Sequence, residues 1–452
     1  MASTRSSAAD GAPPSAVSLR EALRFWWKLG WIGFGGPAGQ IALMHAELVE
    51  RRRWISEKRF LHALNYCMLL PGPEAQQLAT YLGWLLHRTW GGILAGVLFV
   101  LPSLFILVAL AWLYMAHGDA PAVAGFFHGI KPAVTAIVAQ AAVRIGSRSL
   151  RNGWLGAIAV GAFVALFAFD VPFPAIVASA ALLGHAGGRL RPAAFGAAVA
   201  AAPVPGQARE QGRALIDDDT PVPAHARFSW RRAGRVLLAG AGLWLLAIGG
   251  LGAAFGADAV LVRMAWFFTK AALMTFGGAY AVLPYVHQGA VEHFQWITAA
   301  QMMDGLALGE TTPGPLIMVV SFVAFVGGWA RALFGPEALP LAGATAAAVV
   351  TFFTFLPSFV FILLGGPFIE STRGNLRLAA PMAGIAAAVV GVIANLAVFF
   401  ALHVFWPQGL HAGPDVHALL IGLAAAVALM RWRVGVVPVI LAAGLAGLVA
   451  GL

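Results

Sequence analysis

Two short motifs interrupt apolar segments of this chain, and each occurs twice. Phe-Gly-Gly stands at 34–36 and at 276–278, and Pro-Gly-Pro stands at 71–73 and at 313–315. Glycine adds backbone freedom and proline removes a hydrogen-bond donor, so both residue types break helices. A helix that starts after such a break presents free N–H groups and about half a positive charge, which suits an oxyanion. The motifs therefore predict an anion site built from helix ends.

Both motif pairs have the same spacing, since 276 − 34 and 313 − 71 each give 242. Between Lys28 and Pro73, 13 of 46 positions are identical to the residues 242 positions later. A duplicated apolar segment with glycine and proline interruptions is typical of membrane transporters whose substrate site lies between two repeats.

The composition indicates an integral membrane protein. Of 452 residues, 60% are hydrophobic and only 11% are charged, whereas soluble domains carry about 25% charged residues. The net charge of +10 resides mainly in loops between apolar segments, which the positive-inside bias explains better than nucleic-acid binding. The single cysteine, Cys67, excludes internal disulfides and cysteine-based metal or redox clusters.

The chain divides into two similar halves. Each half has, in order, a segment broken at Phe-Gly-Gly, one broken at Pro-Gly-Pro, a long span containing Leu-Pro-Ser (101–103 and 356–358), and three further apolar segments. The expected parts are a disordered tail (1–17), the first repeat (18–188), a polar cytoplasmic linker that suits a mobile loop (189–235), an unpaired transmembrane helix (236–255) and the second repeat (256–452).

The basic residues predict that the halves lie oppositely in the membrane. Loops 51–59 and 144–151 are basic, whereas their counterparts, 289–300 and 405–417, lack lysine and arginine. The bias reverses around 118–119 and 170–172, whose counterparts carry the arginines. Because this bias sets orientation, we expect an all-α polytopic protein with two inverted-topology repeats. If the broken segments enter and leave the membrane on the same side, the chain has nine full spans and four re-entrant segments. If they are ordinary crossings, it has 13 spans.

Polar residues beside the breaks are the candidate ligands. Lys28 and Lys270 occupy equivalent positions and either balance an anion or extend to the membrane interface. Glu74 and Glu310 suit a proton relay or cap helix ends. The predicted translocation site comprises Lys28, Phe34, Gly35, Gly36, Pro37, Gln40, Pro71, Gly72, Pro73, Glu74, Gln77, Lys270, Phe276, Gly277, Gly278, Glu310, Thr311, Thr312, Pro313, Gly314 and Pro315.

Other repeated residues have simpler interpretations. His45 and His287 are either substrate donors or packing histidines, and Trp54 and Trp296 suit interface anchors better than ligand contacts. Asp304 has no acidic counterpart in the first half. The chain lacks a Walker A lysine motif, H-E-x-x-H and G-x-S-x-G, so no ATP-driven pump, familiar hydrolase, metal or cofactor is predicted.

Two signatures resemble the chromate transporter family of the long-chain, two-domain type. The first is Phe-Gly-Gly-Pro at 34–37 followed by Leu-Pro-Gly-Pro-Glu-Ala-Gln-Gln-Leu-Ala-Thr-Tyr-Leu-Gly-Trp at 70–84. The second is Thr-Phe-Gly-Gly-Ala-Tyr at 275–280 followed by Glu-Thr-Thr-Pro-Gly-Pro-Leu-Ile-Met-Val at 310–319. The resemblance covers nearly the whole chain outside the tail and the linker. Ser321 departs from the pattern, which has glutamine there in close relatives.

The resemblance implies multi-pass insertion in a bacterial cytoplasmic (inner) membrane and chromate efflux that confers chromate resistance, with sulfate as the physiological analogue. It also implies oppositely oriented halves. A carrier of sulfate or another oxyanion is the nearest alternative; a membrane-embedded enzyme and a passive channel are alternatives of other classes. The coupling ion and the formation of a homodimer are left open.

Overall fold

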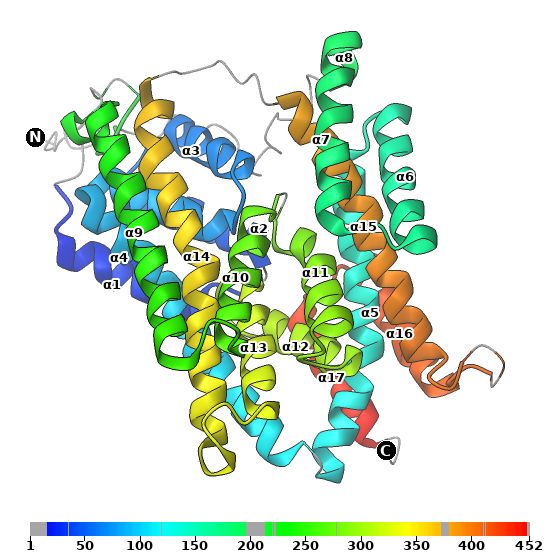
Figure 1. Ribbon diagram of the computed structural model, residues 1–452. Helices are drawn as coiled ribbons and strands as arrows, with labels where there is room; N and C mark the ends of the chain where they lie inside the picture. The colour runs from blue at the N-terminus through cyan, green and yellow to red at the C-terminus, as the bar shows by residue number, and fades with distance from the viewer. Residues whose placement is uncertain are drawn as a thin grey trace, which may run out of the picture.

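The computed structural model describes residues 16–34, 36–118, 120–195, 213–218, 220, 223–276, 278–371, 379–409, 411 and 413–449. These residues form helices joined by short connections (Figure 1). Within those ranges the β-type pairing is a single isolated bridge between Ile55 and Ile216. The predicted all-α class is confirmed. The predicted tail at 1–17 lies almost entirely outside the described residues.

The first repeat contains eight main elements. They are α1 (Leu19–Ile32), α2 (Gly36–His45), the π-helical turn η1 (Ala46–Arg51), α3 (Glu57–Leu69), α4 (Glu74–His117), α5 (Pro121–Ser149), α6 (Gly153–Phe169) and α7 (Phe173–Leu190). The long α4 has non-helical backbone angles at His87 and Arg88, where it kinks. The short α8 (Pro192–Phe195) and η2 (Ala224–Ala226), then the unpaired α9 (Trp230–Phe255), connect the repeats.

The second repeat has the same order. It consists of α10 (Val260–Leu273), α11 (Ala279–His287), the π-helical turn η3 (Gln288–His293), α12 (Ala299–Thr311), η4 (Leu316–Met318), α13 (Val319–Ala330), η5 (Pro336–Ala338), α14 (Leu339–Ser371), α15 (Ala379–Phe405), α16 (Val416–Met430) and α17 (Val436–Val449). α13 and α14 together correspond to the kinked α4.

The offset of 242 extends to backbone detail. η1 and η3 begin and end 242 residues apart, and positive φ angles recur at Arg53 and Gln295. The α3 helix starts at Ser56, whose side chain accepts from the N–H of Arg59, and α12 starts at the equivalent Thr298. Serine and threonine stabilise helix starts by capping free N–H groups. Similar local sequence therefore produces the same local structure twice.

Apart from α4, the helices beside the breaks are too short to cross a bilayer alone. Among these α-helices α11 is the shortest, with 9 residues, and α1 and α10 are the longest, with 14 each. At 1.5 Å per residue the longest is about 21 Å, against about 30 Å of hydrocarbon. Five helices, α4, α5, α9, α14 and α15, are long and apolar enough to span it. The predicted count of crossings stays a prediction.

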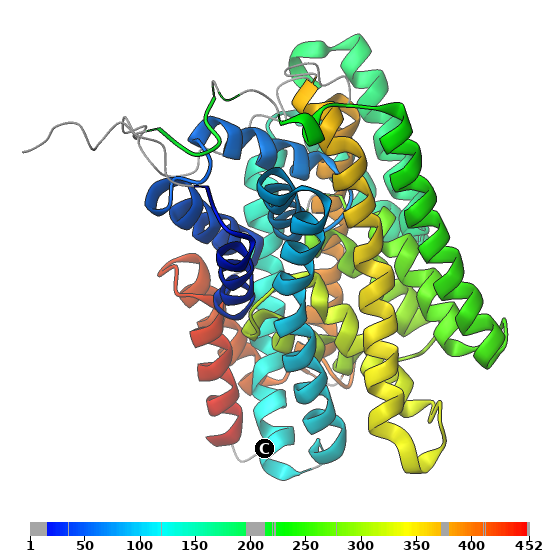
Figure 2. The ribbon, with the colours of Figure 1, turned by 90° about the vertical axis from the view of Figure 1, so that its left-hand side faces the viewer.

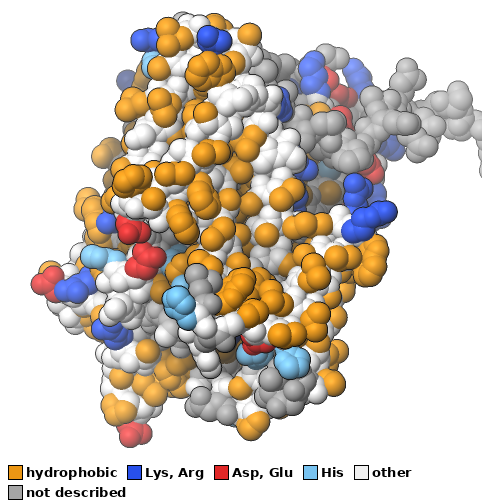
Figure 3. Space-filling model, turned by 90° about the vertical axis from the view of Figure 1, so that its right-hand side faces the viewer, with side chains coloured by type: hydrophobic (Ala, Val, Ile, Leu, Met, Phe, Trp, Pro, Cys, Tyr) orange, Lys and Arg blue, Asp and Glu red, His pale blue; other side chains and the backbone are white. Residues whose placement is uncertain are grey.

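The outer surface is apolar, as expected for contact with lipid. Figure 3 shows hydrophobic side chains over the middle of the face that includes α6, with lysine or arginine side chains at its upper edge. Exposed side chains such as Phe167 and Leu182 belong to this surface. In the most apolar 18 residues of α9 no residue is buried, and Ala233, near its start, is the one buried residue described in this helix. A helix that buries almost nothing in protein needs lipid around it, which confirms a multi-pass membrane protein.

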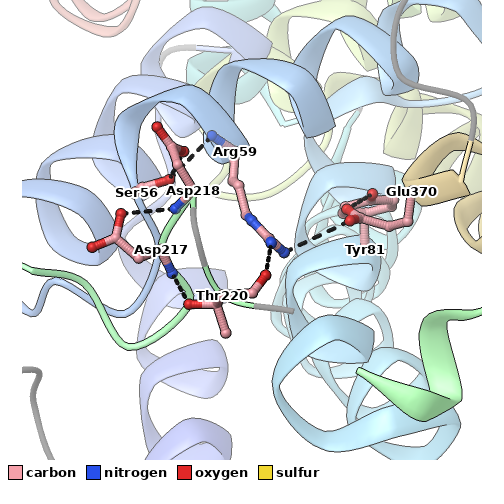
Figure 4. Close-up of polar contacts among 7 residues, drawn as sticks. All are labelled: Ser56, Arg59, Tyr81, Asp217, Asp218, Thr220 and Glu370. Carbon is pink, nitrogen blue, oxygen red and sulfur yellow. Dashed lines mark hydrogen bonds and ion pairs between the residues drawn. The ribbon is translucent and has the colours of Figure 1, made fainter. Parts of the chain in front are cut away.

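Part of the linker is docked on the first repeat, whereas its composition predicted a mobile loop. The backbone N–H of Leu215 donates to Arg53 O at 2.9 Å, and that of Ile216 donates to Trp54 O at 3.1 Å. The Ser56 hydroxyl also donates to Asp218 Oδ1 at 2.7 Å (Figure 4). Composition does not reveal this docking, because the partners lie 162 residues away in sequence. Residues 196–212 of the linker lie outside the described residues.

A buried ion pair joins the docked linker to both repeats. Arg59 of α3 lies 3.7 Å from Glu370 of α14, with side chains 6% and 4% exposed. Its Nη2 also donates to Thr220 O at 2.5 Å. The Tyr81 hydroxyl of α4 donates to the same carboxylate at 2.6 Å. Figure 4 shows Arg59 extended between the linker and Glu370.

Candidate functional site

The four predicted helix breaks meet through two reciprocal backbone hydrogen bonds. The N–H of Gly72, in the first Pro-Gly-Pro, donates to Thr275 O at 2.7 Å. The N–H of Gly314, in the second Pro-Gly-Pro, donates to Gly33 O at 3.0 Å. Gly33 and Thr275 are 242 residues apart, and so are Gly72 and Gly314. The Pro-Gly-Pro glycine of each repeat therefore donates to the residue that directly precedes the Phe-Gly-Gly motif of the other repeat.

The central glycines of both Pro-Gly-Pro motifs have backbones that favour glycine. The φ angle is +126° at Gly72 and +104° at Gly314. A Cβ on Gly314 would lie 2.6 Å from Ser103 Cβ in the other repeat, and one on Gly72 would overlap Ser358 Oγ. The absence of a side chain thus permits α4 and α14 to bring a serine against each break.

Four buried polar side chains lie at these two contacts between the repeats, and we call them the break cluster: Gln40 and Ser103 beside Gly314, and Gln77 and Ser358 beside Gly72. All four are almost completely buried. The Gln40 amide donates to Gly33 O at 3.0 Å and to Gly314 O at 2.5 Å. The Gln77 amide donates to Pro71 O at 2.7 Å.

Each member of the break cluster retains a polar atom without a partner among the described residues. These atoms are the Oε1 atoms of Gln40 and Gln77 and the hydroxyls of Ser103 and Ser358. Buried polar groups are nearly always paired, so unpaired groups at both contacts between the repeats indicate a place for water or a ligand. The serine hydroxyls can donate to such a ligand.

Helix starts add positive potential to the break cluster. α4 starts after Pro73 and α11 starts after Gly278, and neither start has a side-chain cap. Their first N–H groups therefore lack the side-chain acceptor that caps most helices. Uncapped starts attract negative charge. Together with two donating hydroxyls, they make the cluster suited to an oxyanion.

Two carboxylates lie next to the helix starts. Glu74, half-buried at the first position of α4, has Oε1 3.8 Å from where a Cβ on Gly278 would stand. Glu310 is buried and accepts a hydrogen bond from the Tyr280 hydroxyl. Each carboxyl group interacts electrostatically with an exposed arginine of α5, Glu74 with Arg148 and Glu310 with Arg144.

Several predicted residues line the breaks without offering free donors. The hydroxyl of Thr311 donates to Ala307 O at 3.0 Å within α12, and that of Thr312, just after the helix, donates back to Gly309 O at 3.2 Å. Pro73, Pro313 and Pro315 are buried, and Gly36, Pro37, Pro71 and Phe276 are half-buried. Gly35 and Gly277 lie outside the described residues.

The two repeated lysines are not buried with the break cluster. Lys28 and Lys270 are exposed on α1 and α10. The ammonium of Lys270 lies 5.9 Å from the ring centroid of Trp266. Phe34 is also exposed. Long basic side chains at such positions extend along apolar surface toward water, so the structure favours the interface alternative for both lysines.

The repeated histidines each contact a glutamate five residues later in the chain. His45 Nδ1 lies 3.3 Å from Glu50, and the equivalent His287 Nδ1 lies 3.3 Å from Glu292. These pairs hold the π-helical turns η1 and η3. Asp304, also buried, accepts from the Tyr114 hydroxyl at 2.9 Å and lies 3.9 Å from Lys131.

The sequence predictions omitted Ser103 and Ser358 from the site. The signal was present, because both serines belong to the repeated Leu-Pro-Ser motif. That motif served only to align the halves. Its offset is 255 and not 242, so alignment alone does not place it beside the Pro-Gly-Pro breaks. Only the crossing of α4 and α14 brings each serine to the opposite repeat.

Comparison with known proteins agrees with this double architecture. The family model for the chromate transporter matches residues 20–185 and 262–448. A chromate transport protein of Pseudomonas aeruginosa is 33% identical over 448 residues, covering 96% of this chain and 93% of that protein. One of Cupriavidus metallidurans is 27% identical over 437 residues, covering 96% and 93%. No solved structure matches. The chain therefore belongs to the chromate transporter family, as its two signatures predicted.

Proposed function

We propose that this protein exports chromate across the membrane, with the oxyanion bound at the break cluster. One observation carries the location: reciprocal hydrogen bonds bring equivalent breaks of both repeats around four buried side chains with unpaired polar atoms. Relatives named as chromate transport proteins support the substrate. Chromate and sulfate are both tetrahedral dianions, so sulfate is the natural competitor.

The proposed direction needs no ATP. The movement of a dianion out of a cell held at about −100 mV releases roughly 4.6 kcal/mol of free energy, at about 2.3 kcal/mol per charge. That free energy sustains an outward gradient of about three decades. Export by a secondary transporter in a bacterial cytoplasmic membrane would lower internal chromate and so confer resistance.

Alternating access follows from the duplicated site. The two repeats contact each other at the break cluster through equivalent groups. A rocking motion can therefore exchange the arrangements that the two repeats adopt around the site. Inverted halves, predicted from the loop charges, would place that exchange across the membrane. The arginines expected in one of those loops, at 373 and 377, lie outside the described residues.

Uptake of labelled chromate into everted membrane vesicles tests the proposal. We expect uptake above that of vesicles without the protein, inhibition by excess unlabelled sulfate, and a response to an imposed proton gradient if protons are exchanged. No chromate uptake, with labelled sulfate taken up instead, would show a sulfate carrier. No transport of either oxyanion by correctly inserted protein would refute the function.

Neutralising Glu74 is expected to abolish most efflux. Glu74→Gln retains the side-chain shape but removes the ionisable carboxyl group that faces the start of α11. We expect the initial rate to fall about tenfold or more, as intramembrane carboxylates commonly serve the transport step. Glu337→Gln, in the exposed turn η5, is the matched control. Equal rates for both variants at equal membrane levels would remove Glu74 from the mechanism.

Removing either unpaired hydroxyl is expected to weaken oxyanion binding without destabilising the protein. A hydrogen bond to a charged group contributes about 1.5–3 kcal/mol, so Ser103→Ala or Ser358→Ala should raise the KM for chromate about 10–100-fold. Ser321→Ala is the control, since its buried hydroxyl already donates to Met318 O at 2.7 Å, in the turn η4 just before α13. An unchanged KM in both cluster variants would place the substrate elsewhere.

A further inference from the structure

A long apolar groove opens on the outer surface between α4, α9 and α14. Its volume is about 680 Å³. α14 forms its floor and contacts both of the other helices. Figures 1 and 2 show α9 and α14 side by side along most of their length. On one flank Gly240 of α9 is so close to α14 that a Cβ there would overlap Val360.

The groove has the length and the apolar lining that an acyl chain requires. On α4 its lining extends from Thr89 to Leu104, about 22 Å of helix at 1.5 Å per residue, against about 15 Å of hydrocarbon in one leaflet. Away from its arginine end the lining is apolar apart from Thr351, whose hydroxyl donates to Ala347 O at 2.7 Å. An apolar occupant therefore leaves no donor unpaired there.

One end of the groove is basic. Arg232 and Arg235, in the first turns of α9, belong to its lining. Among the described residues Arg235 donates through Nε to Arg231 O at 3.4 Å, and its side chain is exposed. Arg88 also lies near this end. Burial lowers the pKa of His225 most, and the nearby charges of Arg88 and Arg232 lower it further. No carboxylate belongs to the described lining.

Aromatic residues place this basic end at headgroup depth. Trp230, just before the arginines, is 82% exposed, and its ring lies 5.1 Å from that of Phe228. Tryptophan is enriched at membrane–water interfaces. The groove therefore starts at the headgroup level and extends inward along the hydrocarbon.

We propose that an anionic glycerophospholipid occupies this groove, with its phosphate on Arg235 and an acyl chain against α14. The geometry matches the charge and the apolar body of such a lipid at the corresponding depths. Guanidinium groups form charge-assisted hydrogen bonds with phosphate. A zwitterionic lipid fits the apolar part equally but gains less from the basic end.

The lipid would contact the structure that carries the break cluster. Leu101 and Leu104 flank Ser103, Leu356 and Phe359 flank Ser358, and all four line the groove. The acyl chain would thus pack on the outer side of both Leu-Pro-Ser segments. Occupancy of the groove is then a means by which membrane composition sets how α4 and α14 pack.

Native mass spectrometry of the purified full-length protein tests this site with phosphatidylglycerol and phosphatidylethanolamine as probes. We expect preferential retention of phosphatidylglycerol and about tenfold weaker retention by Arg235→Gln, from loss of a charge-assisted contact. Arg231→Gln, one turn earlier and outside the groove, should retain wild-type binding. Equal retention of both lipids by the wild type, or no difference between the two variants, would overturn the proposal.

A second pair of variants tests the groove itself. Ala239→Phe places a ring in the groove, whereas Leu238→Phe changes the neighbouring outward position, which is 75% exposed. We expect Ala239→Phe alone to lose retained phosphatidylglycerol, while both variants elute as folded protein in size-exclusion chromatography. Full retention by Ala239→Phe would place the lipid outside the groove.

Discussion

Alanine at Gly314 or Gly72 is expected to reduce chromate transport about a hundredfold or more, since displacement of site groups by about 1 Å has effects of that size. Each φ angle exceeds +100°, where alanine costs roughly 1–3 kcal/mol. At Gly314 the new Cβ would lie 2.6 Å from Ser103 Cβ, and at Gly72 it would overlap Ser358 Oγ. A Cβ cannot rotate away, so relief of the overlap at Gly314 must separate the repeats and stretch their reciprocal hydrogen bonds. At Gly72, Ser358 Oγ and the Gln77 amide nitrogen must both move.

Gly335 provides a matched control for backbone strain. Its φ angle is +88°, but a Cβ there has no heavy atom within 4 Å. Gly335→Ala should therefore transport chromate at close to the wild-type rate. Initial rates in everted vesicles, normalised to the inserted protein, compare the three variants. Equal activity of Gly314→Ala and Gly335→Ala would show that the close contact of the repeats is not needed for transport.

Loss of Arg59 is expected to destabilise the fold by about 3–5 kcal/mol, the usual result of removing one partner of a buried ion pair. Arg59→Ala leaves the Glu370 carboxylate, only 4% exposed, without its cation. It also removes the hydrogen bond to Thr220 O that helps to dock the linker. The free energy of unfolding in mixed detergent micelles measures the effect.

Lys58 is the control for this prediction because it is the neighbouring cation on the same helix. Its side chain is 81% exposed and lies 4.0 Å from Asp218. Exposed pairs contribute about 0–1 kcal/mol, so Lys58→Ala should change stability little. The double variant Arg59→Met/Glu370→Leu should recover much of the loss, because it leaves no uncompensated charge. Similar stabilities of Arg59→Ala and Lys58→Ala would contradict the structural role.

Local features were predictable because they depend on residues close in sequence. The Phe-Gly-Gly and Pro-Gly-Pro motifs marked the helix breaks, and glycine and proline act on the backbone at their own positions. The equivalent caps at Ser56 and Thr298 likewise follow from adjacent residues.

Contacts between distant segments account for the differences. Exposure of Lys28 and Lys270 depends on how α1 and α10 rotate in the bundle, which their sequence repeat does not specify. Docking of the linker depends on hydrogen bonds from Leu215 and Ile216 to the backbone of Arg53 and Trp54, which lie 162 residues earlier in the sequence. The unpaired hydroxyls of Ser103 and Ser358 became visible only with the crossing of α4 and α14.

The sequence by itself determined that the chain is a duplicated, helical membrane protein with four interrupted segments, because hydrophobicity, periodic repetition and helix-breaking residues act locally. The tertiary structure decided that each Pro-Gly-Pro break pairs with the opposite repeat, through the bonds from Gly72 to Thr275 and from Gly314 to Gly33. A backbone N–H exposed by a break must find an acceptor away from water. Which carbonyl it finds depends on the packing of whole helices.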